Sequence, residues 1–499
     1  MILIEDLTSF VISLLIGIIG LNMVFFGFVL WRRLTRQRFF LEKDAARECY
    51  RPIVQALLAG TMSTEHAVTV LSKATSPAER EAVSGLLMTG TGEGRARCTL
   101  VHYGLGNVEQ WCREAFGRRR TAELLAMIRS NQPYTPHDRK DPIPQRLRRL
   151  RMHSVPRALA LDNLAALDPE WAYIFCTEGL LDASQEVRAM SIRGLGRTRL
   201  KKALPGLFHE MEKCIETRSD LSLRGVKTAL IEFGIEDLAA YTPYLTHPNH
   251  RFRFFVVDSA REICNRAGAK GVLNKNDFTP EFYETVLKSS TMDSFADVRA
   301  RAASIIKHFR DAGAAQALRQ LLTDENEYVR LHAVRACADR YYVSLIPDVT
   351  KLMRDPKWRV RESAAEALGA IGGGLTDLYG EFIKTTDLYQ SEQIAEHIQR
   401  GGLIPHIIAE LHEGGEARKR AFTVVQKLAL LKKTTLISTI LEAPEIGDEV
   451  RMQIIQALSI APSRPFQNAL QAILKQSPSP ALAGTVNAAL NLRAKGGMA

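Results

Sequence analysis

Three histidines and one glutamate near residue 400 are the residues whose types and spacing come nearest to a reactive site. His406 and Glu410 are four residues apart, so they would share one face of a helix, and His397 and His412 lie nearby. Imidazole nitrogens and carboxylate oxygens on one face are ligands that Zn²⁺ accepts. Most such pairs are ordinary polar positions on a helix, and we interpret these residues in that way.

Other motifs for chemistry are incomplete. The glycine-rich stretch MTGTGEGRA at 88–96 lacks the Gly-Lys followed by Ser or Thr that a phosphate-binding loop needs, so we interpret it as a turn. The sequence contains no HExxH, no GxSxG and no kinase signature. Its seven cysteines are scattered without a CxxC pair, which favours a reducing compartment over disulfides or zinc. We therefore predict no catalytic residue, no metal and no cofactor.

Positive charge is the one chemical anomaly. The chain carries a formal net charge of +11, and the stretch from Arg113 to Arg157 has twelve Lys or Arg against four acidic residues. The cations of interest are Arg118, Arg119, Arg120, Arg139, Lys140, Arg146, Arg148, Arg149 and Arg151. They indicate either a solvated linker or a contact with anionic lipid, an acidic protein or nucleic acid. Aromatic side chains for base stacking are sparse here, so nucleic acid is the least favoured partner.

An apolar stretch near the N-terminus predicts a membrane span. Leu7–Trp31 holds 25 consecutive uncharged residues, and about 20 suffice to cross a bilayer as a helix. A cleaved signal peptide fits poorly, because Glu5 and Asp6 precede the stretch and no A-x-A site follows it. The cations that follow the span are Arg32, Arg33, Arg36 and Arg38. Because such cations mark the cytoplasmic side, we expect the N-terminus outside and the remaining chain in the cytoplasm.

A repeat of fixed length occupies the second half of the chain. Segments starting at Asp293, Asp324 and Asp355 align without gaps at a period of 31 residues, and a fourth starts at Asp182. Each has Val-Arg five and six residues after the Asp, which gives the sets Asp182 and Arg188, Asp293 and Arg299, Asp324 and Arg330, and Asp355 and Arg361. A fixed period of this size is typical of a solenoid.

The apolar pattern of one repeat predicts a helical hairpin. Within 360–371 the apolar residues recur at i, i+4, i+7, i+8 and i+11, which is one face of an α-helix. Asp355 before Pro356 is typical of an N-cap followed by a first-turn proline. The preceding stretch LIPDVTKLMRD at 345–355 has the spacing of a second, antiparallel helix.

At these residues the sequence resembles the HEAT repeat family, including the short bacterial HEAT-like repeats of phycobilisome lyases. The resemblance covers roughly 150–490 and implies that the repeated Asp and Arg form a structural ladder between successive repeats. Weaker copies near 155, 223, 252, 417 and 450 lack the full signature. The step from Phe252 to Val298 is 46 residues, so we expect an inserted loop or helix within 265–280.

The fold class predicted for the whole chain is all-α: an α-solenoid of HEAT-like helical hairpins preceded by one N-terminal transmembrane helix. A chain of 499 residues is too long for one core, and its 7% aromatic content suits packed helices. The expected parts are an outer N-terminus at 1–6, the span at 7–31, a helical juxtamembrane region at 32–131, a basic linker at 132–150, the repeat array at 151–490 and a tail at 491–499.

These features favour a non-enzymatic scaffold or adaptor that binds a protein partner at the cytoplasmic face of a bacterial inner membrane. We expect the partner to belong to a membrane or envelope assembly or to a signalling complex. The resemblance also implies an alternative, an enzyme or enzyme subunit of the phycobilin-lyase kind. A nucleic-acid-binding HEAT protein is a further alternative, and it predicts affinity that falls steeply with salt.

Overall fold

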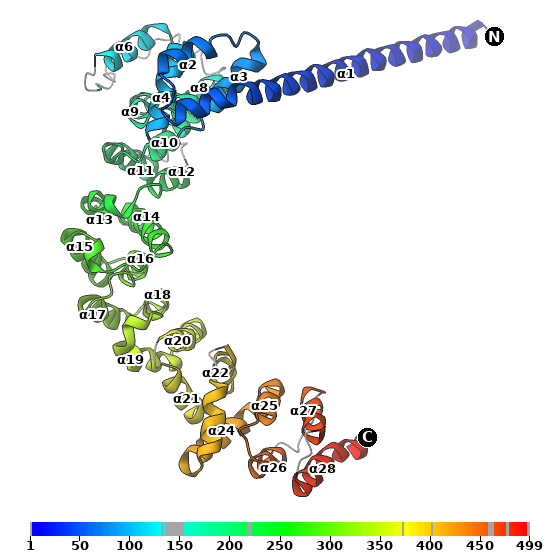
Figure 1. Cartoon of the computed structure of the whole chain (residues 1–499), viewed down its shortest axis with the longest axis vertical. Helices are drawn as coiled ribbons and strands as arrows, with labels where there is room; N and C mark the ends of the chain where they lie inside the picture. Colours follow the sequence, from blue (N-terminus) through cyan, green and yellow to red (C-terminus); the bar gives the residue numbers. More distant parts are fainter. Residues whose placement is uncertain are drawn as a thin grey trace. The chain divides into compact units, whose positions relative to one another are not determined.

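The computed structural model describes residues 2–130, 134, 154–216, 222–371, 374–400, 403–457, 464–475 and 479–496. Within these ranges the chain forms 27 α-helices and no strand, which confirms the prediction of an all-α solenoid. The helices divide into two compact units, Met1–Phe233 and Gly234–Ala499, which follow one another from blue to green and from green to red in Figure 1. The sequence alone did not predict a division at this point.

The first unit begins with α1, Ile2–Leu58, a single helix of 57 residues. At 1.5 Å per residue it is about 85 Å long, and Figure 1 shows it projecting from the helices that follow it. It is the one helix in the described ranges that is long and apolar enough to span a membrane. Large apolar side chains between residues 17 and 34 are exposed, whereas Val54 and Leu57 are buried in a core with α2, α3 and α4. The helix continues without a break through Trp31, where we expected the span to end.

Shorter helices complete the first unit. They are α2 Thr64–Leu71, α3 Pro77–Leu87, α4 Gly92–Gly104, α5 Asn107–Phe116, α6 Arg118–Arg129, α8 Ser154–Leu164, α9 Pro169–Gly179, α10 Gln185–Thr198, η2 Lys201–Ala203, α11 Leu204–Glu216 and α12 Leu223–Leu230. Local capping sets several of their starts; the Ser76 hydroxyl and the Glu79 carboxylate, for example, form a capping box at α3. A second core joins α5, α6, α8 and α9 around Trp111 and Phe175.

The second unit stacks helical hairpins. Its elements are η3 Ile235–Tyr241, α13 Thr242–Leu245, α14 His250–Gly268, η4 Lys275–Asp277, α15 Pro280–Met292, α16 Ala296–Ile306, α17 Ala312–Leu321, α18 Glu327–Cys337, η5 Arg340–Leu345, α19 Ile346–Lys351, η6 Leu352–Arg354, α20 Trp358–Ala370, α21 Gly374–Lys384, α22 Leu388–Arg400, α23 Ile404–Glu413, α24 Gly415–Leu430, α25 Thr434–Glu442, α26 Asp448–Ala457, α27 Arg464–Lys475 and α28 Pro480–Gly496. The second helices of successive hairpins, α14, α16, α18 and α20, pack side by side. The inserted residues form the end of α14 and a loop with η4.

In α14, α16 and α18 an arginine connects two hairpins. Arg299 donates from Nε and Nη2 to the two carboxylate oxygens of Asp324, at 2.8 and 2.9 Å. Its Nη1 donates to the backbone carbonyl of Asp293 in its own hairpin, at 2.8 Å. Arg330 makes the same contacts with the carboxylate of Asp355 and the carbonyl of Asp324. Each guanidinium therefore holds its own loop and the next loop together, with the bidentate geometry that carboxylates favour.

Two further arginines pair with an aspartate of the next hairpin although no Asp precedes them in the pattern. Arg253 binds both carboxylate oxygens of Asp293 and the carbonyl of His247. In the first unit, Arg157 pairs with Asp182, whose carbonyl also accepts a hydrogen bond from Arg188.

Arg361 ends this series. It donates only to the carbonyls of Asp355 and Pro356, and no carboxylate partner is found for it among the described residues.

The expected N-cap role of Asp355 is wrong. Helix α20 begins at Trp358, and its N-cap is Lys357, whose side chain makes no capping bond. The carboxylate of Asp355 instead accepts hydrogen bonds from the backbone N–H of Lys357 and from Arg330. The reason is that the aspartate lies in the loop before the cap, where it meets the arginine of the preceding hairpin.

We expect Arg330→Ala to lower the free energy of unfolding by about 2 to 3 kcal/mol, because it leaves the carboxylate of Asp355 buried without its cation. Arg361→Ala removes an arginine from the equivalent position, where it donates to carbonyls and lies over the ring of Tyr389 but pairs with no carboxylate, so about 1 kcal/mol is expected. Urea denaturation of the two variants measures both values. Equal losses would contradict a special role for the carboxylate pair.

Candidate interaction surface

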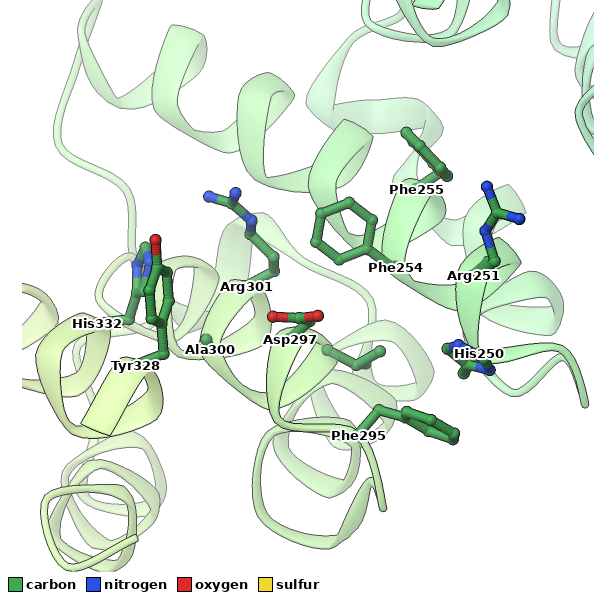
Figure 2. Close-up of a pocket in the computed structure, with 11 residues that line it drawn as sticks. His250, Arg251, Phe254, Phe255, Phe295, Asp297, Ala300, Arg301, Tyr328 and His332 are labelled. Carbon is green, nitrogen blue, oxygen red and sulfur yellow. The ribbon is translucent and has the colours of Figure 1, made fainter. Parts of the chain in front are cut away.

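A groove lies on the face formed by the first halves of α14, α16 and α18. Its volume is about 430 Å³, and the side chains that line it are shown in Figure 2. They are His250, Arg251, Phe254 and Phe255 of α14; Phe295, Asp297, Val298, Ala300 and Arg301 at α16; and Tyr328 and His332 of α18. All of them belong to the second unit.

The repeat determines which positions line this groove. In each helix, the positions two residues before and two residues after the arginine that joins the hairpins face it. They are Arg251 and Phe255, Asp297 and Arg301, and Tyr328 and His332. Two such positions are four residues apart, so they lie one turn apart on the same side of the helix. The groove is therefore a set of equivalent repeat positions that differ in side chain.

Aromatic rings and guanidinium groups form most of the groove. The ring of His250 stacks on that of Phe295, with centroids 3.8 Å apart. The guanidinium of Arg301 lies 5.5 Å from the centroid of the Phe254 ring. Phe295 and Tyr328 are 43% and 50% exposed, so these apolar surfaces face solvent. Aromatic and arginine side chains of this kind are enriched where proteins bind other proteins.

The charged side chains that line the groove are Arg251, Arg301 and Asp297, and His332 adds no charge to them. Arg301 lies 3.5 Å from the carboxylate of Asp258, whereas Arg251 has no acidic partner among the described residues. Burial, which is the largest cause, and the nearby Arg301, Arg335 and Arg261 together lower the pKa of His332 to about 4, against the opposing effect of Asp258. A hydrogen bond joins Nδ1 of His332 and the hydroxyl of Ser304, at 3.1 Å. His332 is therefore neutral at physiological pH.

The predicted basic contact residues have different environments. Arg118 and Arg119 are exposed, but Arg120 points inward and donates to both carboxylate oxygens of Glu178. The hydroxyl of Tyr134 donates to the same carboxylate at 2.8 Å. The charge of Arg120 is therefore neutralised by Glu178 inside the first unit. The sequence alone did not predict this ion pair.

Some of the remaining predicted residues lie within the described part of the chain and others lie outside it. Those after the proposed span, Arg32, Arg33, Arg36 and Arg38, are exposed along α1. Those that lie outside the described residues are Arg139, Lys140, Arg146, Arg148, Arg149 and Arg151.

The histidines near residue 400 form no site for a metal in the described part of the chain. The carboxylate of Glu410 accepts hydrogen bonds from the hydroxyl of Tyr379 and the guanidinium of Arg420, and His406 lies 3.9 Å from it. Across the described ranges, no group of three or more His, Cys, Asp or Glu side chains could hold a metal ion.

A second type of ion pair between hairpins was missed at the level of sequence. Arg310 and Arg199 follow the ends of α16 and α10 with left-handed backbones, at φ of 50° and 53°. Arg310 pairs with Asp339 at 2.5 Å, and Arg199 with Glu232 at 3.3 Å. Both arginines stand eleven residues after the repeat arginine, Arg299 or Arg188, and this spacing is the signal that could have found them.

Comparisons with known proteins identify the repeat. A family model described as HEAT repeats matches residues 284–369. No curated protein matches the chain.

Solved structures with some likeness include human deoxyhypusine hydroxylase in complex with glycerol, at 18% identity over 51% of this chain and 95% of that chain, with a TM-score of 0.22. An engineered protein is 16% identical over 85% of this chain and 98% of its own, with a TM-score of 0.29. Kap95 from a Kap95:Nup1 complex is 13% identical over 82% of this chain, with a TM-score of 0.38, and 62% of its length is spanned. These likenesses are too distant to bear on function.

The lowered pKa of His332 predicts a loss of stability in acid. Between pH 6.5 and 4 the unfolded chain binds a proton at this residue that the folded chain does not bind, so stability falls as pH decreases through that window. His332→Gln keeps a hydrogen-bonding group toward Ser304 and should reduce the loss between pH 7 and 5 by about 2 kcal/mol. Urea denaturation at both pH values measures it, with the exposed His66→Gln as a control that should behave like the parent. An unchanged loss in His332→Gln would contradict the assignment.

Proposed function

We infer that this chain, a HEAT-repeat protein, is a scaffold that binds a protein partner in the groove of α14, α16 and α18 and is held at a membrane by α1. The proposal assigns no reaction to the chain. The observation that supports it most is the gathering of half-exposed aromatic rings and arginines across three successive repeats. Such a surface leaves apolar area in contact with water until a partner covers it.

The geometry of the groove favours an extended segment of the partner. Packed helices lie 8–10 Å apart, and an extended chain advances about 3.3 Å per residue, so about three residues of the partner would pass each helix. An apolar side chain would lie against Phe254 and Phe295, and a carboxylate would meet Arg251. Because the arginine–aspartate pairs hold the three helices together, little ordering of the groove is needed on binding.

The composition and exposure of α1 support an anchor. Its apolar part is unburied, and Trp31 stands where an interfacial aromatic residue belongs, directly before Arg32 and Arg33. We propose that the helix crosses the inner membrane of a bacterium with the N-terminus outside. The partner is then a component of a membrane or envelope assembly reached from the cytoplasm.

The same helix would act as a spacer. Lys43 is the twelfth residue after Trp31, and its contact with Glu81 of α3 is the first ion pair of α1 with another helix among the described residues. Twelve residues of α-helix span about 18 Å. The compact part of the first unit would therefore stand clear of the lipid head groups.

Photocrosslinking tests the groove. A benzoylphenylalanine in place of Tyr328 should yield a crosslinked partner in native membranes, whereas the same group in place of Tyr341 of η5 should not, although both tyrosines are 50% exposed. Adding Arg251→Glu should remove the adduct at 328, because it reverses the charge that faces the partner's carboxylate. Equal adducts at both positions, or an adduct that survives the charge reversal, would refute binding in this groove.

Fractionation tests the anchor. The full chain should remain in membranes washed with sodium carbonate, and a chain beginning at Arg32 should be released, because the uncharged stretch is then absent. A reporter protein that is active only in the cytoplasm should be active when fused after Ala499. Periplasmic phosphatase activity from that fusion would contradict the orientation, and a full chain extracted by carbonate would contradict the anchor.

A further inference from the structure

A second groove lies in the first unit between α5 and α6. Its volume is about 450 Å³, and arginines dominate its lining. Gly117 joins the two helices with a φ of +82°, a conformation that side-chain-bearing residues rarely adopt. The turn brings Glu109 and Arg113 of α5 to the groove together with Arg118 and Arg129 of α6.

The two arginines that α6 contributes to the groove lie far apart along the helix. Residues 118, 122, 125 and 129 follow the spacing i, i+4, i+7 and i+11, which places them on one face of α6. Arg118 and Arg129 are therefore about 16 Å apart along the helix axis. Ala122 and Leu125 lie between them. A cation thus stands at each end of the α6 wall, with the exposed Ala122 and the largely buried Leu125 between them.

The positive charge of this groove is only partly neutralised. Arg113 pairs with Glu109 at 2.6 Å. The guanidinium of Arg129 is oriented by an uncharged group, since its Nε donates to the hydroxyl of Tyr103. Arg118 has no acidic partner among the described residues, and the first turn of α6 contains no acidic residue. The positive end of the helix dipole adds to the charge at Arg118.

We propose that this groove binds an acidic segment of a protein partner. Two cations about 16 Å apart are too far from each other for one phosphate, but they match carboxylates about five residues apart in an extended chain. A small apolar side chain between those carboxylates would lie against Ala122. A bilayer fits less well, because on the proposed anchor the α1 spacer of about 18 Å exceeds the Debye length of about 8 Å.

The test uses the full chain in neutral detergent and a labelled six-residue peptide, Glu-Glu-Leu-Leu-Glu-Glu. The double variant Arg118→Gln and Arg129→Gln should raise the Kd of this peptide about tenfold, because both end cations are lost. The control double variant Arg119→Gln and Arg224→Gln removes the same charge from exposed positions outside the groove. It should leave the Kd within about twofold of the parent. A peptide with Gln in place of every Glu should not bind.

Three outcomes would overturn the proposal. Equal losses in the two double variants would show attraction to the net charge and not to the groove. Equal binding of the Glu and Gln peptides would remove the role of carboxylates. The double variant Arg118→Gln and Arg129→Gln could instead lose binding to phosphatidylglycerol vesicles while it binds the peptide as before. That result would show that the groove binds a lipid surface. An unchanged melting temperature in both double variants establishes that the fold is intact. None of these results depends on whether a partner binds the groove of α14, α16 and α18.

Discussion

The bond between an arginine of one hairpin and an aspartate of the next sets the spacing of the repeats. In the pair of Arg330 and Asp355 the side chains are only 13% and 3% exposed, so both charges have lost most of their water. Removing charges from water is costly unless they are paired and hydrogen-bonded, and here the guanidinium also satisfies a carbonyl of its own hairpin. One arginine side chain thereby holds two loops together. The second helices of successive hairpins, α14, α16, α18 and α20, are aligned as a result. This alignment also forms the groove, because the residues that line it stand two positions before and two positions after the same arginine in each helix.

Much of this arrangement could be predicted from the sequence, because the chemistry recurs at a fixed distance. The Asp-Val-Arg spacing identified the hairpins and the pairs of Arg299 with Asp324 and of Arg330 with Asp355, but it also predicted a ladder role for Arg361, which has no carboxylate partner among the described residues. It did not identify Arg253, whose aspartate follows 40 residues later because the end of α14 and the η4 loop are inserted between them. Arg157 was missed because Arg151 stands six residues before it, where the pattern has an aspartate, although its partner Asp182 follows at the usual separation of 25 residues.

The candidate surfaces could not be predicted, because their side chains vary where the framework repeats. Arg251, Asp297 and Tyr328 occupy one repeat position and share no chemistry. A similar limit applies to the arginine run of α6, where each residue is rotated by about 100° from the last. Arg118 faces the groove, Arg119 faces solvent and Arg120 meets the buried Glu178. The sequence shows that these three arginines are positively charged. Only the packing of α6 against its neighbours determines which of them is buried and which faces solvent.

Amide hydrogen exchange of the full chain measures most directly whether the arginine–aspartate pairs make the surface of α14 to α20 rigid. Helices joined on both sides by such pairs, α16 and α18, should open together and exchange slowly. Within the same unit α24 and α26 lack this pair among the described residues, and they should exchange faster through smaller openings. Similar exchange in the two groups, or faster exchange in α16 and α18, would contradict the account.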